Sequence, residues 1–263
     1  MSEEPAPAAE AVKKGDFVLL DYEIWAEGQG KTELVDTTRR EVAEQAQWTG
    51  RPEGEFGPSP HLIGREYFPA ALEQAIASLK VGESLDREFS PAEAFGERDP
   101  KLIELFSMRE ISRLPEMRRE DATLEVGTTL HIQGRRGRVV SFTTGRVRVD
   151  FNNPLAGKKI RAKVTVRSRL TEPKDIARAV LQLDYGHGND FQVDLRDGTV
   201  EVRLPDRAKF DVGWLSSKVR VIEDLREHLK PASIVFLEEF KTPVPKTETP
   251  SSGETPSPSA PTT

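Results

Sequence analysis

The sequence predicts a mixed α+β protein, and three segments carry that prediction. Residues 17–25 (FVLLDYEIW) are largely apolar on both faces, which is typical of a buried β-strand. Residues 69–80 (PAALEQAIASLK) place apolar side chains at helical spacing, with Pro69 in the first turn and Gly82 beyond the end. Residues 139–149 alternate around a Thr-Thr-Gly turn, which indicates a β-hairpin.

The last third of the folded chain has its own order of elements. A helix is expected over residues 175–183, opened by Thr171. It is followed by a hairpin, a second helix ended by Pro231, and a last strand, over residues 191–204, 212–229 and 233–240. This α-β-β-α-β unit is small but long enough to form a core. Two further strands are expected at residues 85–89 and 160–166.

Composition excludes several classes of protein. The 263 residues include 38 Lys+Arg and 44 Asp+Glu, so the net charge of −6 disfavours a polyanion binder held by bulk charge. The absence of Cys excludes disulfides, thiolate zinc sites and a cysteine nucleophile. Because the four His are not at ligand spacing, we expect no metal and no cofactor.

Neither end of the chain has the composition of a folded segment. Residues 241–263 contain 6 Pro and 10 Ser/Thr, so they are expected to be a disordered tail, and residues 1–11 a flexible arm. The sequence has no apolar run long enough for a membrane span, and its N-terminus has no apolar core of a secretory signal. We therefore expect a cytoplasmic protein without a membrane partner.

An ordered set of motifs occupies residues 14–22, 34–38, 72–76, 79–83, 92–98 and 147–158. In order and spacing these motifs resemble the FKBP-type peptidyl-prolyl isomerases, specifically the SlyD-like and long archaeal members, in which an insert-in-flap domain interrupts the catalytic domain. Among them, Asn153-Pro-Leu-Ala-Gly157 follows the family's N-H-P-L-A-G, with Asn153 in place of the histidine. The region 171–240 looks like the extra C-terminal domain of the long archaeal forms.

The resemblance implies a fold and a set of domain boundaries. It implies an antiparallel half-barrel sheet wrapped on one helix, a small β-rich flap domain inserted into it, and a C-terminal α/β domain. The catalytic domain would comprise residues 12–97 plus 158–170, the insert residues 98–157, and the C-terminal domain residues 171–240. The insert holds 11 basic and 8 acidic residues, a charge of +3.

The resemblance also implies a prolyl pocket. Tyr22 and Asp36 match the family's strand tyrosine and pocket aspartate, and Phe95 stands in place of a more usual Tyr, which removes a hydroxyl donor. The expected catalytic residues are Tyr22, Asp36, Phe68 and Phe95. Peptide binding is expected at Val35, Ile63, Pro69, Leu72 and Ala162. Ala162 stands where the family places Phe or Tyr, which would leave that wall open.

Pro69 departs most sharply from the family. An ungapped alignment puts it where the family offers a backbone N–H to the substrate carbonyl, and proline has no N–H. A shift of one residue would return that role to Phe68. The sequence leaves both alignments open, and it leaves open that the aromatic residues of this region are only core.

The chemistry that the resemblance implies needs no nucleophile or base. Rotation about an X–Pro bond has a barrier of about 18–20 kcal/mol because it breaks amide resonance. A dry apolar pocket that binds the twisted amide better than the planar one lowers this barrier. The expected partners are unfolded or nascent proline-containing polypeptides, which the insert would hold through apolar side chains. The candidate contacts are Ile103, Leu105, Phe106, Met108, Met117 and Phe142, whose alternative role is the insert's own core.

Three alternatives remain at this stage. A catalytically weak holdase could have kept the scaffold, since Pro69, Phe95 and Ala162 each remove a donor or a wall. The arginines at positions 135, 136, 138, 146 and 148 could bind RNA, although no aromatic stacking pair accompanies them and nucleic acid is therefore disfavoured. The region 171–240 could join two copies of the chain into a homodimer or contact clients.

Overall fold

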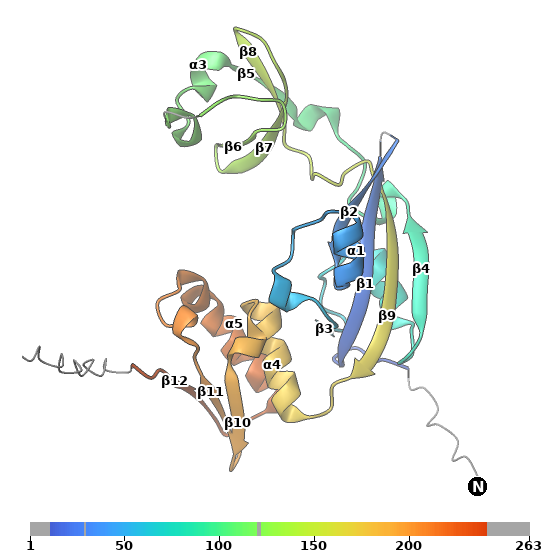
Figure 1. The fold of residues 1–263 in the computed structure, drawn as a ribbon, viewed down its shortest axis with the longest axis vertical. Coiled ribbons are helices and arrows are strands. Elements are labelled where there is room, and N and C mark those ends of the chain that lie inside the picture. Colours follow the sequence, from blue (N-terminus) through green and yellow to red (C-terminus); the bar gives the residue numbers. More distant parts are fainter. Residues whose placement is uncertain (1–10, 29, 120–121, 241–263) are drawn as a thin grey trace, which may run out of the picture.

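The computed structural model describes residues 11–28, 30–119 and 122–240, which form three sheets and three apolar cores (Figure 1). We call these the central unit, the insert unit and the C-terminal unit. The expected tail, residues 241–263, lies outside the described residues, as does most of the expected N-terminal arm. Ala11, the last residue of that arm, forms a β-bridge with Lys80, so ordered pairing begins one residue earlier than expected.

The central sheet has five antiparallel strands. They are β1 (Phe17–Gly28), β2 (Lys31–Thr37), β3 (Ser59–Leu62), β4 (Ser84–Phe89) and β9 (Lys159–Arg169). Their order is β2-β1-β9-β4, and β3 pairs with the first residues of β1. Since β1 pairs with β2, β3 and β9, it is the strand on which the other elements of the unit are arranged.

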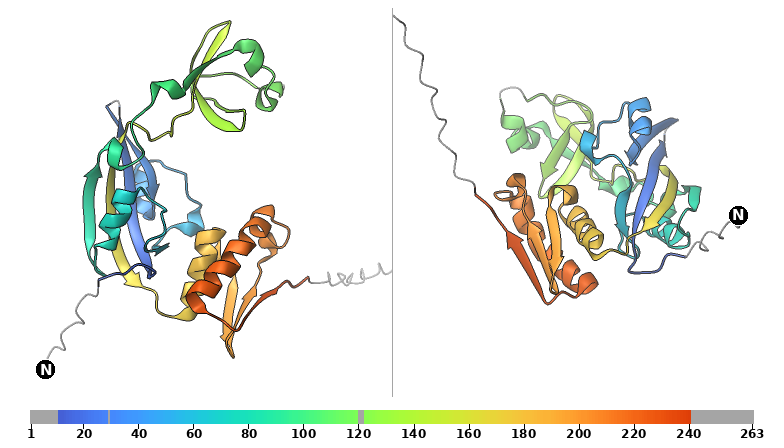
Figure 2. Two further views of the ribbon diagram at one scale, coloured as in Figure 1. Left: turned by 180° about the vertical axis from the view of Figure 1, so that it is seen from behind. Right: turned by 60° about the horizontal axis from the view of Figure 1, so that its bottom comes forward.

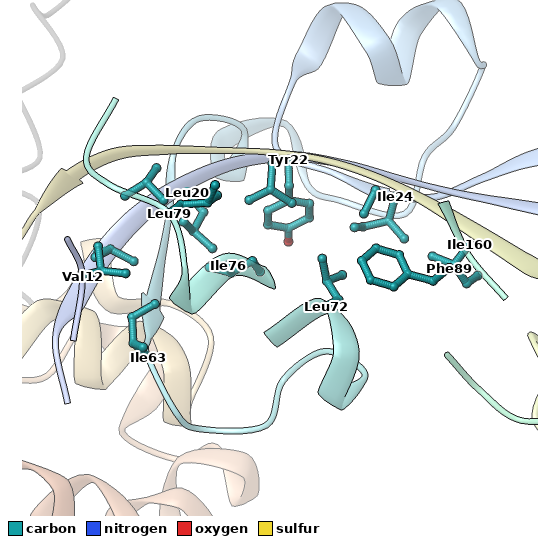
Figure 3. Close-up of a cluster of buried hydrophobic side chains, with 14 of the residues drawn as sticks. Val12, Leu20, Tyr22, Ile24, Ile63, Leu72, Ile76, Leu79, Phe89 and Ile160 are labelled. Carbon is teal, nitrogen blue, oxygen red and sulfur yellow. The ribbon is translucent and has the colours of Figure 1, made fainter. Parts of the chain in front are cut away.

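A single helix, α2 (Ala70–Ala77), covers one face of this sheet (Figure 2). Its Leu72 and Ile76 are fully buried against alternate side chains of β1, among them Leu20 and Ile24 (Figure 3). The helix begins one residue later than expected, because Pro69 is its N-cap rather than a residue of its first turn. It also ends at Ala77, since the N–H groups of the next two residues donate to the carbonyls three residues back, in the tighter i→i−3 pattern.

A shorter helix, α1 (Arg40–Gln45), and a 3₁₀ turn at Glu53–Glu55 lie between β2 and β3. Neither was expected from the sequence. Arg51, just before the 3₁₀ turn, reaches back to β1 and β2.

The insert unit leaves the central sheet after β4 and returns to it at β9. Its elements are β5 (Ile103–Ser107), α3 (Met108–Ile111), β6 (Thr129–Ile132), β7 (Arg135–Phe142) and β8 (Arg146–Asp150), with 3₁₀ turns at Pro91–Glu93, Pro100–Leu102 and Pro115–Arg118. The strands are antiparallel in the order β5-β8-β7-β6, and β7 and β8 form the hairpin expected around Gly145. Figure 1 shows this unit standing apart from the C-terminal unit.

The C-terminal unit follows β9 directly. Its elements are α4 (Pro173–Asp184), β10 (Gln192–Arg196), β11 (Thr199–Arg203), α5 (Val212–Leu229) and β12 (Ser233–Leu237), with 3₁₀ turns at Gly188–Asp190 and Asp206–Ala208. The hairpin turn uses Asp197 and Gly198, both at positive φ, as a two-residue hairpin requires. β11 and β12 are parallel.

Two details of this unit differ from the sequence prediction. The first helix is opened by Glu172 and Pro173 rather than by Thr171, because the fixed φ of proline suits the first helical position. The last strand ends at Leu237 rather than at residue 240. The mixed α+β class is confirmed; the central and insert sheets are antiparallel, and the C-terminal sheet is mixed.

The C-terminal unit packs directly on the central unit. Phe17 of β1 and Leu62 of β3 belong to the apolar core that contains α4 and α5, and the Phe17 ring meets His228 of α5 edge-on at 4.9 Å. β1 therefore contributes to two cores, through Phe17 at its start and through its inward face further on. Among the described residues, no helix is both long and apolar enough to cross a membrane.

Candidate functional site

Tyr22 of β1 points toward α2 and is almost completely buried (Figure 3). Thr37, the last residue of β2, and Thr38 after it fix its backbone. The Tyr22 N–H donates to Thr38 Oγ1 at 2.9 Å, while the Thr37 hydroxyl and the Thr38 N–H donate to the Tyr22 carbonyl at 2.9 and 3.0 Å. The position of the phenol ring is thus set by the sheet and not by a mobile loop.

A compact polar group surrounds the Tyr22 hydroxyl. The hydroxyl donates to Asp36 Oδ2 at 2.8 Å, and Arg51 Nη2 donates to the Tyr22 oxygen at 2.7 Å and to Asp36 Oδ1 at 3.2 Å. The Arg51 guanidinium also lies over the Tyr22 ring, 5.6 Å from its centroid. The sequence analysis missed Arg51; its signal is that a half-buried carboxylate such as Asp36 requires a cation.

This environment raises the pKa of the Tyr22 hydroxyl well above its ordinary value. Burial is the main cause, and the neighbouring Asp36 carboxylate adds to it, while Arg51 opposes both. The hydroxyl therefore stays protonated and remains a hydrogen-bond donor across the physiological range.

Apolar side chains form the rest of the site. The Phe68 ring meets Tyr22 edge-on with a centroid distance of 5.4 Å and stacks on His61 at 5.6 Å. Leu72 is fully buried beneath them, and Val35 and Phe95 are half-buried against the same cluster. The structure therefore brings Tyr22, Asp36 and Phe68 into direct contact, and it places Leu72 in the same core cluster and Val35 and Phe95 against it.

Two expected peptide-binding residues are placed differently. Ile63 belongs to the same cluster but lies at its Val12 end, away from Leu72 (Figure 3). Ala162 is fully buried in a cluster that also holds Phe89, so its small side chain does not leave the wall open to solvent, as the sequence had suggested.

The segment before α2 resolves the question of the backbone donor at Pro69. Glu73, a buried carboxylate, accepts from the Tyr67 and Phe68 N–H groups at 3.0 and 2.8 Å and pairs with His61 Nε2 at 3.0 Å. The Phe68 N–H is therefore already used, and Pro69 has none. Neither alignment left open by the sequence supplies a free N–H at this point, and in the first turn of α2 the N–H groups of Leu72 and Glu73 donate to the Pro69 carbonyl at 2.9 and 3.0 Å.

The candidate client contacts divide between core and surface. Phe106, Met108 and Met117 pack against the core of the insert unit, which is their alternative role. Ile103 is half-buried, and Leu105 and Phe142 are 52% and 43% exposed. Phe106 and Phe142 both pair with Val147 and so share its face, whereas Leu105 pairs with Arg148 on the opposite face.

No group of three or more His, Cys, Asp or Glu side chains in the described ranges is placed to hold a metal ion. The absence of a cofactor stays a prediction.

Comparisons with known proteins agree on one family. Family models for the FKBP26 C-terminal region and the FKBP26 IF domain match residues 173–241 and 113–155. The chain is 29% identical over 166 residues to the short-type peptidyl-prolyl cis-trans isomerase of Methanocaldococcus jannaschii, covering 62% of this chain and 96% of that protein. It is 30% identical over 158 residues to the FKBP-type 16 kDa peptidyl-prolyl cis-trans isomerase of Escherichia coli, covering 60% and 93%.

A third relative is the FKBP-type isomerase SlyD of Aeromonas hydrophila, 29% identical over 140 residues, which cover 51% of this chain and 61% of that protein. The chain therefore belongs to the FKBP-type peptidyl-prolyl cis-trans isomerases and carries an insert-in-flap domain. This confirms the resemblance from which the pocket was inferred; the roles of its individual residues stay predictions.

The tyrosines give a test of the site's burial that needs no substrate. Burial raises the pKa of Tyr67 and Tyr185 to about 12, and that of Tyr22 is also raised. Because each folded-state pKa lies above the unfolded value, their stabilising contribution is complete below about pH 10 and is lost as pH rises toward 12. We expect an alkaline titration to show no tyrosinate absorbance near pH 10 while the protein stays folded.

The matched reference is the same titration in denaturant, where all three tyrosines should ionise near pH 10. If one tyrosine of the folded protein ionises near pH 10, the Tyr22→Phe variant shows whether that tyrosine is Tyr22. Loss of the transition in the variant would contradict the buried Tyr22–Asp36 contact.

Proposed function

We propose that this chain isomerises X–Pro bonds of unfolded polypeptides in the pocket formed by Tyr22, Phe68 and Leu72, within a central sheet that wraps on α2 as a half-barrel. The observation that carries the proposal is the edge-on contact of the Tyr22 and Phe68 rings above the buried Leu72, beside the Tyr22–Asp36 hydrogen bond. Such a site offers a prolyl ring apolar walls together with fixed polar groups at one edge.

The physical role of these walls is to favour the twisted amide. Twisting an X–Pro bond removes its resonance and reduces its charge separation. The free-energy cost of moving the amide from water into an apolar site is therefore smaller for the twisted transition state than for the planar ground state. Phe68 and Tyr22 supply the apolar rings, and Leu72 supplies the floor. Ala70 and Ala71 begin α2, and we assign their N–H groups as the backbone donors for a flanking carbonyl, since those of Leu72 and Glu73 donate to the Pro69 carbonyl.

Replacing Phe68 by Ala tests the pocket. We expect kcat/KM on a short peptide with one X–Pro bond to fall by about tenfold, which corresponds to about 1.4 kcal/mol of lost transition-state stabilisation. The measurement is exchange NMR of the cis and trans forms. Phe142→Ala in the insert unit is the matched control and should leave this rate unchanged.

A catalytically weak holdase is the second candidate, because the Phe68 N–H is occupied, Pro69 has no N–H and Phe95 has no hydroxyl. No acceleration by the unaltered protein at stoichiometric concentration, together with suppression of client aggregation, would establish the holdase and refute the isomerase.

We also propose that the insert unit holds clients through the face that carries Phe142 and Phe106. Phe142 is large, apolar and 43% exposed, and it lies in one row with Phe106 across Val147. A client bound there would be held close to the prolyl pocket at high effective concentration.

Serine substitutions on the two faces of the insert sheet test this client site. Phe142→Ser should weaken suppression of aggregation, with client affinity lower by about tenfold if most of the ring is buried on binding. Leu105→Ser removes an equally exposed apolar side chain from the opposite face and should have no such effect. Equal losses in both variants, or no loss in either, would refute the assigned face.

For the C-terminal unit we propose self-association through α5. Val212, Leu215 and Val219 lie at i, i+3 and i+7 and are 73%, 59% and 61% exposed, which makes an apolar stripe along the outer face of the helix. Phe210, 81% exposed, extends this stripe. An apolar surface of this kind is typical of a protein interface, and a second copy of the chain is the partner we infer.

Sedimentation equilibrium tests the dimer. We expect the unaltered chain to have twice the monomer mass and Leu215→Glu to be monomeric, because a charge in an apolar interface loses its hydration without a partner. Val126→Glu, at an exposed apolar side chain of the insert unit, should remain dimeric. A monomeric unaltered chain at high concentration would refute self-association.

A further inference from the structure

Two segments that form walls of the prolyl pocket are also held by the C-terminal unit. The first, residues 63–69, carries Phe68. Its Arg65 donates through Nη2 to Asp184 Oδ1 of α4 at 2.7 Å and through Nη1 to Asp224 of α5. One guanidinium of the central unit is thus clamped between both helices of the C-terminal unit.

The Arg65 contact is directional and largely shielded from water. The Asp184 side chain is 0% exposed and that of Arg65 is 33% exposed. Burial raises the pKa of Asp184, and the Arg65 guanidinium opposes this shift by favouring the ionised carboxylate. Asp224 lies beside Asp184 and also raises its pKa, so removing Arg65 would leave a buried carboxylate next to a second one without the cation that they share.

Arg65 is joined to Phe68 by a short series of contacts. Its guanidinium lies over the Tyr67 ring, 5.4 Å from the centroid, and Tyr67 lies against His61 at 5.2 Å. The N–H groups of Tyr67 and Phe68 both donate to Glu73 Oε1. The segment between Arg65 and α2 is therefore held at both ends, by the C-terminal unit at Arg65 and by α2 at Glu73.

The second segment, residues 51–56, carries Arg51. Arg207 Nη2 donates to His187 Nε2 at 2.9 Å, so the proton of the neutral ring is on Nδ1, which donates to Glu55 Oε1 at 3.1 Å. The carbonyl of the same Glu55 accepts from Arg51 Nη1 at 3.3 Å. The C-terminal unit thus reaches the polar edge of the pocket as well as its aromatic wall.

We propose that the C-terminal unit positions the prolyl pocket, with Arg65 and Glu55 as positioning residues that hold the Phe68 and Arg51 segments in their substrate-binding places. The inference rests on the proposed function of this pocket and adds to it a role for residues that do not touch the peptide. Phe17 of β1 and Leu62 of β3 pack in the core of the C-terminal unit and join it to the central unit. The contacts at Arg65 and Glu55 are therefore made by a unit that is already packed in place.

Loss of the clamp should act on binding more than on the rotation itself. Once released, the Phe68 segment samples other conformations, and a peptide must order it again on binding. That cost is shared by the ground state and the transition state, so KM should rise while kcat changes little.

Arg65→Ala in the full-length chain tests the proposal. We expect KM to rise by about tenfold with kcat within about twofold of the unaltered enzyme. Arg65→Lys keeps a cation for Asp184 and should recover a substantial part of the loss. Arg220→Ala is the matched control, because Arg220 donates to the Asp184 carbonyl from within the C-terminal unit and does not contact the pocket segments in the described structure.

Glu55→Ala gives a second, independent variant if Arg65→Ala does not fold, and it should raise KM in the same direction. Aromatic NMR resonances of Phe68 and Tyr22 should shift in Arg65→Ala and stay in place in Arg220→Ala. Folded Arg65→Ala and Glu55→Ala proteins with unchanged KM and unchanged Phe68 resonances would overturn the proposal.

The two proposals fail differently. An unaltered chain without isomerase activity refutes the proposed function. In that case the Phe68 resonances of Arg65→Ala, compared with those of the unaltered chain, still show whether the C-terminal unit positions residues 63–69. An active unaltered chain whose KM and resonances do not respond to Arg65→Ala refutes the positioning role alone.

Discussion

The alternation of side chains along β1 is the constraint on which the rest of the molecule depends. Because successive residues of a strand point to opposite faces, Leu20, Tyr22 and Ile24 all face α2. The apolar packing of Leu72 and Ile76 on that face fixes the helix, and the helix in turn presents the segment that carries Phe68. A slip of one residue in the pairing of β1 would turn Tyr22 away from the site.

The polar contacts of the site solve a problem that this packing creates. An aromatic hydroxyl and a carboxylate at the edge of an apolar cluster would be costly without partners. Tyr22, Asp36 and Arg51 satisfy one another, and Glu73 satisfies His61 and the two amides before α2. The first network joins β1, β2 and the segment before the 3₁₀ turn at Glu53–Glu55, and the second ties the segment before α2 to that helix. The polar groups thus have partners, and the apolar walls are left for the peptide that we expect to bind.

Much of the fold could be predicted because its signals are local. The periodicity of residues 69–80 is that of α2, and the Asp197-Gly198 turn marks the hairpin of the C-terminal unit. The roles of Arg51 and Arg65 could not be predicted, since each depends on partners far away in the chain. Glu73 binds partners close in sequence, but only the fold of the segment before α2 brings them to its carboxylate. Ala162 is buried in a cluster that draws on several strands, which its own place in the sequence does not show.

The central claim is that a prolyl peptide binds where Tyr22, Phe68 and Leu72 meet. The most direct measurement is a map of NMR chemical-shift changes as an inert proline-containing peptide is titrated into the labelled full-length chain. The account predicts that the largest changes fall on Tyr22, Phe68, Leu72 and the first turn of α2. Two other hollows exist, one of about 490 Å³ between Trp25 and Trp48 and one of about 300 Å³ beside Phe17 and His228. Changes centred on either hollow, with Tyr22 and Phe68 unaffected, would contradict it.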